Sequence, residues 1–136
     1  MAEWGFRCYL DGAGTDVVRA WYDNGTKEVQ NIFRSRLRIL SSRTIQSWGR
    51  PTYDTLSDDG AGLGEIIFEA NGIAYRPLGF HMRTEKAFVI VLPASKQGKK
   101  NRIKWDPRNA LAEALKRKQE VLNDNGRAIP LWLPLE

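Results

Sequence analysis

The sequence contains few of the residues from which many enzyme sites are built. Cys8 is its only cysteine and His81 its only histidine. One cysteine excludes an intrachain disulfide, and the two residues together are too few for a zinc site of cysteine and histidine. A lone histidine provides neither a catalytic triad nor an acid–base pair, so we expect His81 to be a turn residue at a strand end. The sequence thus predicts no metal and no cofactor.

Long hydrophobic runs and targeting signals are also missing. The longest apolar run, AFVIVLPA at 87–94, is far shorter than the roughly 20 residues of a membrane helix. The first residues, MAEWGFRCYL, lack the basic-then-apolar pattern of a secretion signal. These features predict a soluble cytoplasmic protein with no membrane partner.

Acidic residues are scarce in one part of the chain. The 136 residues carry a net charge of +5, and residues 1–62 hold 8 basic and 8 acidic residues, so the whole excess lies in 63–136. Five cations stand between positions 96 and 104 without one acid: Lys96, Lys99, Lys100, Arg102 and Lys104. Such a run is either a solvated loop or a patch that attracts a polyanion.

The first half of the chain predicts a strand followed by two helices. WGFRCYL at 4–10 is typical of a short strand. We expect Thr15 to cap a short helix that begins at Asp16, and Thr26 to cap a second helix. The second helix has an apolar stripe at helical spacing, formed by Val29, Ile32, Phe33, Leu37 and Leu40. Residues 48–62 are rich in glycine, proline and aspartate and predict a loop.

The second half predicts a three-stranded meander. Two strand-like runs, at 63–70 and 73–80, are joined by Asn71-Gly72, which is typical of a type I′ hairpin. The third strand, at 87–95, is apolar on both faces and should lie at the centre of the sheet.

A helix should follow the basic run. We expect its N-cap at Asp106, Pro107 in its first turn and its end at Asn125-Gly126. Its buried stripe should consist of Leu111, Ala114, Leu115 and Leu122. The fold class is therefore α+β, with a two-helix hairpin and a C-terminal helix packed on a small, mainly antiparallel sheet. One domain should span 1–126, and an apolar tail should span 127–136.

The hairpin brings one arginine and two glutamates together. With Ala70 and Ile73 flanking the turn, Ile67 should pair with Arg76, and the diagonal neighbours of Arg76 on that face are Glu65 and Glu69. One interpretation is an ion network on a solvated face. The other is a guanidinium fixed on a strand and aimed at a phosphate, with a carboxylate nearby.

The basic run leaves the central strand beside the same sheet surface and ends at Trp105. An aromatic ring next to a basic groove offers a stacking surface for bases. A second interpretation, which we favour for Trp105, is a hydrophobic staple that packs on Ala110 just inside the helix.

The stretches LGEIIFEANGIAYRPLGF, AFVIVLPASKQGKK and NALAEALKRKQEVL, together with the order of elements, resemble the RelE/HigB-like toxins of type II toxin–antitoxin systems, in particular their phage-derived branch. The resemblance runs from residue 63 to residue 123 and is weaker before it. It implies a RelE/ParE-like fold and a small basic endoribonuclease that cuts mRNA, usually on the ribosome and without metal. It also implies an antitoxin partner, which we expect to be a helix-turn-helix protein.

By this resemblance, Arg76 matches the strand arginine that contacts the scissile phosphate, and Lys96 and Lys99 match further cationic residues of the active site. The general base stays open between Glu65, Glu69 and a lysine of lowered pKa. The expected RNA-binding residues are Lys100, Arg102, Lys104, Trp105 and Arg83.

Two alternatives remain open. A ParE-like toxin would share the fold but bind DNA gyrase, a role that needs no phosphate-directed cluster. A basic RNA-binding module without catalysis would use the same cations. A helix-turn-helix protein encoded in the neighbouring reading frame would favour a toxin.

Overall fold

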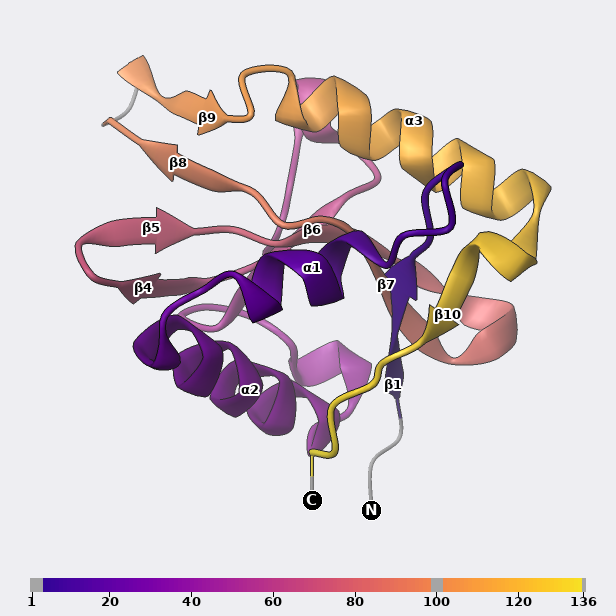
Figure 1. Cartoon of the computed structure of the whole chain (residues 1–136), viewed down its shortest axis with the longest axis horizontal. Coiled ribbons are helices and arrows are strands. Elements are labelled where there is room, and N and C mark those ends of the chain that lie inside the picture. Colours follow the sequence, from indigo (N-terminus) through magenta and orange to yellow (C-terminus); the bar gives the residue numbers. More distant parts are fainter. Residues whose placement is uncertain (1–3, 99–101, 136) are drawn as a thin grey trace.

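The computed structural model describes residues 4–98 and 102–135, which form three α-helices and two β-sheets (Figure 1). The α+β class is therefore confirmed, but a second sheet was not expected. The large sheet contains β1 (Gly5–Tyr9), β2 (Tyr53–Thr55), β3 (Gly64–Ile66), β6 (Leu78–Met82), β7 (Ala87–Leu92) and β10 (Ala128–Pro130). The small sheet contains β4 (Phe68–Ala70), β5 (Ile73–Tyr75), β8 (Ser95–Gln97) and β9 (Lys104–Asp106).

Strand β7 lies inside the large sheet, whose order is β10-β1-β7-β6-β3-β2. All six residues of β7 are buried, which confirms the central strand expected from its apolar sequence. Strand β1 runs parallel to β7, whereas β10 and β6 pair antiparallel with their neighbours. The large sheet is therefore mixed.

The two faces of β7 support two hydrophobic cores. Phe88 and Ile90 pack with α1 (Val17–Asp23) and α2 (Lys27–Ser41), and Val89 and Val91 pack with α3 (Ala110–Asn123). Alternation along one strand thus places helices on both faces of the large sheet.

The helix signals are partly confirmed. The Thr26 side chain accepts a hydrogen bond from the Val29 amide, as expected for the cap of α2. Asp16, and not Thr15, caps α1, because its carboxylate accepts hydrogen bonds from two amides of the first turn.

The expected start of α3 is wrong. The helix begins at Ala110 with Asn109 at its N-cap, and Asp106 ends strand β9 instead. Leu122 is 50% exposed, and the buried positions of the helix are Ala110, Ala114 and Val121. The sequence signals placed the helix three residues too early because the basic run continues into a strand.

Two stretches expected to lack regular structure contribute edge strands. Strand β2 lies within residues 48–62 and pairs with β3, and β10 lies within the apolar tail and pairs with β1.

Two paired glycines of the large sheet, Gly64 and Gly79, make room for aromatic rings. A Cβ on Gly64 would collide with Tyr53, and a Cβ on Gly79 would collide with Phe88.

No helix of the described residues is both long and apolar enough to cross a membrane.

The two runs expected to form one long hairpin are each broken. Residue 67 separates β3 from β4, and residues 76–77 separate β5 from β6. Each run therefore starts in one sheet and ends in the other, and the small sheet projects beside the large one, between α2 and the start of α3 (Figure 1). Arg76 lies at one of these two breaks.

A candidate nucleic-acid interface on the small sheet

One face of the small sheet gathers the cationic residues near Arg76. Ala74 pairs with Lys96, and Lys96 pairs with Trp105, so the Lys96 and Trp105 side chains lie on the same face. The Lys96 ammonium stands 5.3 Å from the centre of the Trp105 ring, within the range of a cation–π contact. Arg76 follows Ala74 by two residues, and alternation along the chain directs it toward this face.

Glu65 connects the two cations. Its Oε1 atom lies 3.7 Å from Arg76 Nε and 3.7 Å from Lys96 Nζ. The Glu65 side chain is 2% exposed, against 16% for Arg76 and 20% for Lys96. Within residues 4–98 and 102–135, neither Glu65 Oε1 nor Arg76 Nε has a hydrogen-bond partner, although both atoms are buried. A single carboxylate thus interacts with two cations through charge and not through hydrogen bonds, and it offsets only one of the two positive charges.

The Arg76 guanidinium is held in place by hydrogen bonds to two backbone carbonyls. Its Nη1 donates to the Tyr75 carbonyl at 2.7 Å and to the Phe68 carbonyl at 3.3 Å. Burial lowers the pKa of Arg76 and repulsion from Arg50 adds to this, while attraction to Glu65 opposes it. Arginine keeps its charge at neutral pH under such shifts. The residue is a rigid, charged group at the join of the two sheets.

This geometry corrects the expected position of Arg76. The last residue pair of the β4–β5 hairpin is Phe68 with Tyr75, so the pairing of Ile67 with Arg76 is not formed. The Ile67 amide instead donates to the Thr52 carbonyl, and its carbonyl accepts from Arg36 Nε. The arginine expected on a strand surface is therefore largely buried beside a break in the strand.

Two cations near this break were missed by sequence reasoning. Arg36 comes from α2 and bonds at Ile67, and Arg50 lies close enough to influence the pKa of Arg76. No signal in the sequence identified them, because their approach depends on how the loop before β2 packs against residue 67.

The other residues predicted for the site lie at different places relative to the face that carries Lys96. Glu69 is exposed on β4 and acts on Arg76 only as a minor attraction. Lys104 is exposed on β9, one residue from Trp105 and hence on the opposite face. Arg102 is exposed just before β9. Lys99 and Lys100 lie outside the described residues. The basic run thus begins in β8 and ends in β9, two paired strands, where a loop was expected.

Arg83 is not brought to the small sheet. It follows the far end of β6, and five strand residues, about 16 Å, separate that end from Arg76. There it lines a hollow with His81 and Lys118. The structure therefore gives no support to grouping Arg83 with the other cations.

Trp105 has two neighbours that explain its position. It is partly buried against the core cluster that contains Ala110, although it does not stand next to a helix N-cap as expected. Its other side borders a surface hollow of about 420 Å³, formed with Ile103, Lys104 and Arg108.

His81 lies in strand β6, enclosed by aromatic rings. The rings of Trp4, Trp48, Tyr53 and Phe88 lie with their centres 5.0–5.8 Å from that of His81. Burial, with repulsion from Arg83, lowers the pKa of His81 to about 4. The imidazole is therefore neutral at pH 7 and remote from the cationic face. Among the described residues, no three His, Cys, Asp or Glu side chains gather closely enough to hold a metal ion.

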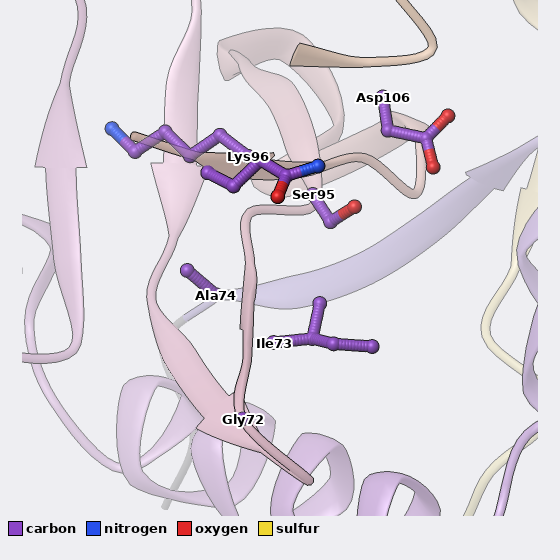
Figure 2. Close-up of a pocket in the computed structure, with 7 residues that line it drawn as sticks. Gly72, Ile73, Ala74, Ser95, Lys96 and Asp106 are labelled. Atoms are coloured by element: carbon purple, nitrogen blue, oxygen red, sulfur yellow. The ribbon is translucent and has the colours of Figure 1, made fainter. Parts of the chain in front are cut away.

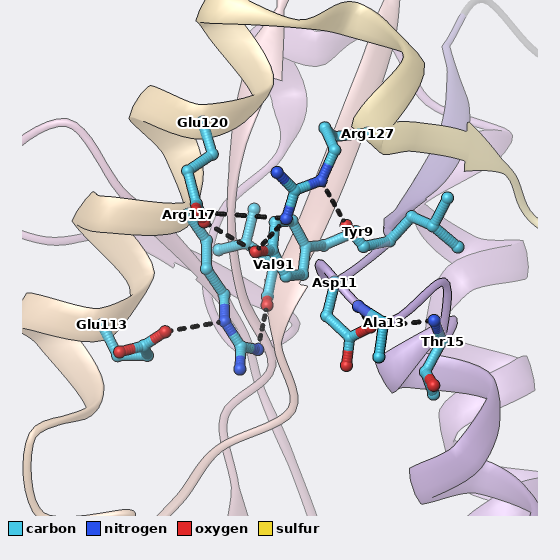
Figure 3. A network of polar contacts seen from close by, with 10 residues as sticks. Tyr9, Asp11, Ala13, Thr15, Val91, Glu113, Arg117, Glu120 and Arg127 are labelled. Atoms are coloured by element: carbon cyan, nitrogen blue, oxygen red, sulfur yellow. Dashed lines mark hydrogen bonds and ion pairs between the residues drawn. The ribbon is translucent and has the colours of Figure 1, made fainter.

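A second polar cluster ties α3 to the large sheet (Figure 3). Arg117 donates to the Val91 carbonyl and to Glu113, at 2.8 and 3.0 Å. Arg127 Nη2 donates to the Tyr9 hydroxyl at 2.8 Å, and that hydroxyl donates to Glu120 at 2.6 Å. The guanidinium groups of both arginines also lie over the Tyr9 ring. Sequence reasoning did not identify this network.

Comparisons with protein-family models, with curated proteins and with solved structures find no match for this chain.

Proposed function

We propose that this chain is a metal-independent endoribonuclease of the RelE/HigB-like kind, a toxin that cuts mRNA and so inhibits translation. The observation that supports it most directly is the cluster in which Glu65 lies 3.7 Å from both Arg76 and Lys96. Two cations share one buried carboxylate, which leaves the cluster with an excess of positive charge. A phosphate group supplies the charge that this cluster lacks.

The reaction requires little covalent chemistry from the protein. The RNA 2′-oxygen attacks the adjacent phosphorus, the 5′-oxygen leaves, and a 2′,3′-cyclic phosphate forms. A base removes the 2′-OH proton and an acid gives a proton to the leaving oxygen. Arg76 and Lys96 stabilise the charge that builds up on the phosphorane, and they are already fixed in place by Glu65, the backbone carbonyls and Trp105.

Glu65 acts in this proposal as a positioning residue. With 2% of its side chain exposed, its carboxylate is covered from an RNA strand on the surface. The base is then Glu69, which is exposed on β4, or Lys96, which is part-exposed beside Arg76. The requirement for a 2′-OH makes DNA a non-substrate.

The partners follow from the same resemblance. We propose mRNA, presented by the ribosome, as the substrate and a helix-turn-helix antitoxin as the inhibitor. The exposed Arg102, just before β9, would contribute a contact to the RNA backbone, and the exposed Lys104 would contribute another on the opposite face of β9.

The burial of Glu65 and Arg76 favours one second candidate, an RNA-binding module without catalysis. Because Glu65 is covered, the cluster presents its cations to RNA without a carboxylate that reaches the 2′-OH.

One experiment separates the two candidates. The purified chain is incubated with mRNA, with and without ribosomes, in the presence of EDTA, and the product ends are mapped. We expect cleavage that survives EDTA and leaves 2′,3′-cyclic phosphate ends, together with growth arrest when the chain is expressed alone in bacteria. A folded chain that binds RNA, leaves it intact and permits normal growth would support the binding module.

A further inference from the structure

The opposite face of the small sheet carries a second set of polar groups. Tyr75, Ser95 and Asp106 are paired across β5, β8 and β9, so their side chains form a row on the face away from Lys96. Figure 2 shows Ile73, Ser95 and Asp106 projecting to one side, while the Lys96 side chain extends away from them.

This row forms the floor of a groove. Two hollows of about 160 and 260 Å³ share Ile73, Ser95 and Asp106, and are therefore adjoining. Apolar groups complete the wider one: Trp21, Tyr75, Pro93 and Pro107. Ile73 is 43% exposed at its edge. Lys96 and Gln97 also line the narrower hollow. The groove thus offers apolar and aromatic walls around the Asp106 carboxylate, the Ser95 hydroxyl and the Gln97 amide.

Asp106 is unusual in its surroundings. It is the only acid between Glu85 and Glu113, in the part of the chain that carries the basic run. Within the described residues it has neither an ion pair nor a side-chain hydrogen bond. An exposed carboxylate among so many cations remains able to accept hydrogen bonds from a ligand.

We propose that this groove binds a guanine base of single-stranded RNA, with Asp106 as the residue that selects it. An ionised carboxylate only accepts hydrogen bonds, so it requires two adjacent donors. Guanine presents its N1–H and N2–H₂ groups side by side on one edge. Adenine, cytosine and uracil each place an acceptor beside their single donor group, and they match a carboxylate less well.

Charge favours a nucleotide over a cationic peptide in this groove. The positive hairpin that attracts a polyanion repels arginine or lysine side chains, whereas RNA satisfies both the cations and Asp106. Strand β9 is also an edge strand of the small sheet. A single strand that passes around β9 therefore reaches Asp106 on one face and Lys96 on the other. The inference rests on the proposed function, because it takes RNA as the ligand.

The test measures binding and not cleavage. Short 2′-O-methyl oligouridines that cannot be cut carry one central guanine, hypoxanthine or adenine, and their affinities are compared for the wild-type chain and Asp106→Asn. Hypoxanthine lacks only the N2 amino group. We expect the wild type to prefer guanine over hypoxanthine roughly 10-fold, the value of one hydrogen bond to a charged group. Asp106→Asn should lose this preference.

The substitution carries its own internal control. Removing a negative charge should leave the affinity for the adenine oligonucleotide equal or raised, while the preference for guanine disappears. A general disturbance of the fold would lower both the affinity for RNA and the preference for guanine. Asp59→Asn, at an exposed aspartate that does not line the groove, is the matched control and should keep the preference.

Three results would overturn the inference. One is an equal guanine-to-hypoxanthine ratio for the wild type and Asp106→Asn. A second is Asp106-dependent binding of a tri-arginine peptide without any base preference for RNA. The third is a chain that cleaves RNA but shows no preference for guanine in binding. That result would overturn the assignment of the groove to guanine and leave the proposed function intact. Failure to bind any RNA would instead overturn the proposed function along with it.

Discussion

Two clusters of arginine and glutamate differ in how completely their polar groups are paired. Around Tyr9, Arg117 and Arg127 donate to backbone carbonyls, and the tyrosine hydroxyl both donates and accepts. At Glu65, the carboxylate oxygen and Arg76 Nε are buried, yet neither has a hydrogen-bond partner among the described residues. The same residue types are used in both places.

This difference in hydrogen bonding indicates which charged cluster stabilises the fold and which has another role. Buried polar groups in proteins are nearly always hydrogen-bonded, so a satisfied network indicates a role in holding elements together. An unsatisfied pair of this kind reduces stability, so its presence indicates a role other than holding the fold together. We therefore assign the Tyr9 cluster to the attachment of α3 and the Glu65 cluster to the candidate site.

The largest expected effect is on cleavage. Arg76→Lys keeps a positive charge but loses the planar fork that matches two phosphate oxygens. We expect the cleavage rate of the folded protein to fall by roughly 100-fold or more, as when one transition-state donor is removed. The matched change in the other cluster, Arg117→Lys, should leave the rate unchanged. Equal cleavage rates for the wild type and Arg76→Lys would contradict the assignment of the Glu65 cluster to the candidate site.

The second effect is on stability. Glu65→Gln keeps the shape of the side chain but leaves Arg76 and Lys96 without a counter-charge, and the free energy of unfolding should fall by about 2 kcal/mol. Glu120→Gln, in the part-exposed Tyr9 cluster, should cost only about 1 kcal/mol. Urea unfolding of the two variants provides the comparison. A larger loss for Glu120→Gln would show that Glu65 is not the essential counter-charge of Arg76 and Lys96.

The third effect is on pH dependence, and it belongs to neither cluster. His81 has a pKa of about 4 when folded, against 6.5 when unfolded, so the unfolded chain binds more protons between these values. The free energy of unfolding should therefore fall as pH decreases from 6.5 toward 4, by about 1 kcal/mol because partial exposure screens the effect.

His81→Phe should remove this slope above pH 5, where few carboxylates titrate, while Tyr9→Phe should keep it. Thermal unfolding at several pH values measures both. A slope that persists in His81→Phe would locate the titrating group elsewhere.

The smallest effect is on salt dependence. If Lys96 contacts the RNA backbone, Lys96→Gln should flatten the slope of log affinity against log salt by roughly 0.7 for a single strand. Lys116→Gln, which removes the same charge from an exposed position on α3, should leave the slope unchanged. Identical slopes for both variants would return Lys96 to a purely structural role.

Much of the fold was readable from local patterns. The apolar stripe of α2, the Thr26 cap and the buried strand at 87–92 depend on neighbouring residues, and each was predicted. The Asn71-Gly72 turn and the pairing of Ala70 with Ile73 were also predicted correctly.

The wrong predictions concern positions whose structure depends on contacts with segments distant in sequence. The strand containing Glu65 breaks at Ile67 because Thr52 and Arg36 bond there, and no local pattern contains those partners. For the same reason Arg76 was placed on a solvated surface, although the chemistry of its neighbours Glu65 and Lys96 was inferred in part. Local signals therefore brought Arg76, Glu65 and Lys96 together, but they did not reveal how deeply these residues are buried.

The pairing of β1 has a consequence for synthesis of the chain. β1 is made before both of its partners, since β7 and β10 follow it by about 80 and 120 residues. Contacts this distant in sequence form slowly, and they cannot form before both partners have emerged from the ribosome. The large sheet, and with it the join that holds Arg76, is therefore complete only after β10 has been made. A chain of the proposed function would stay inactive until then.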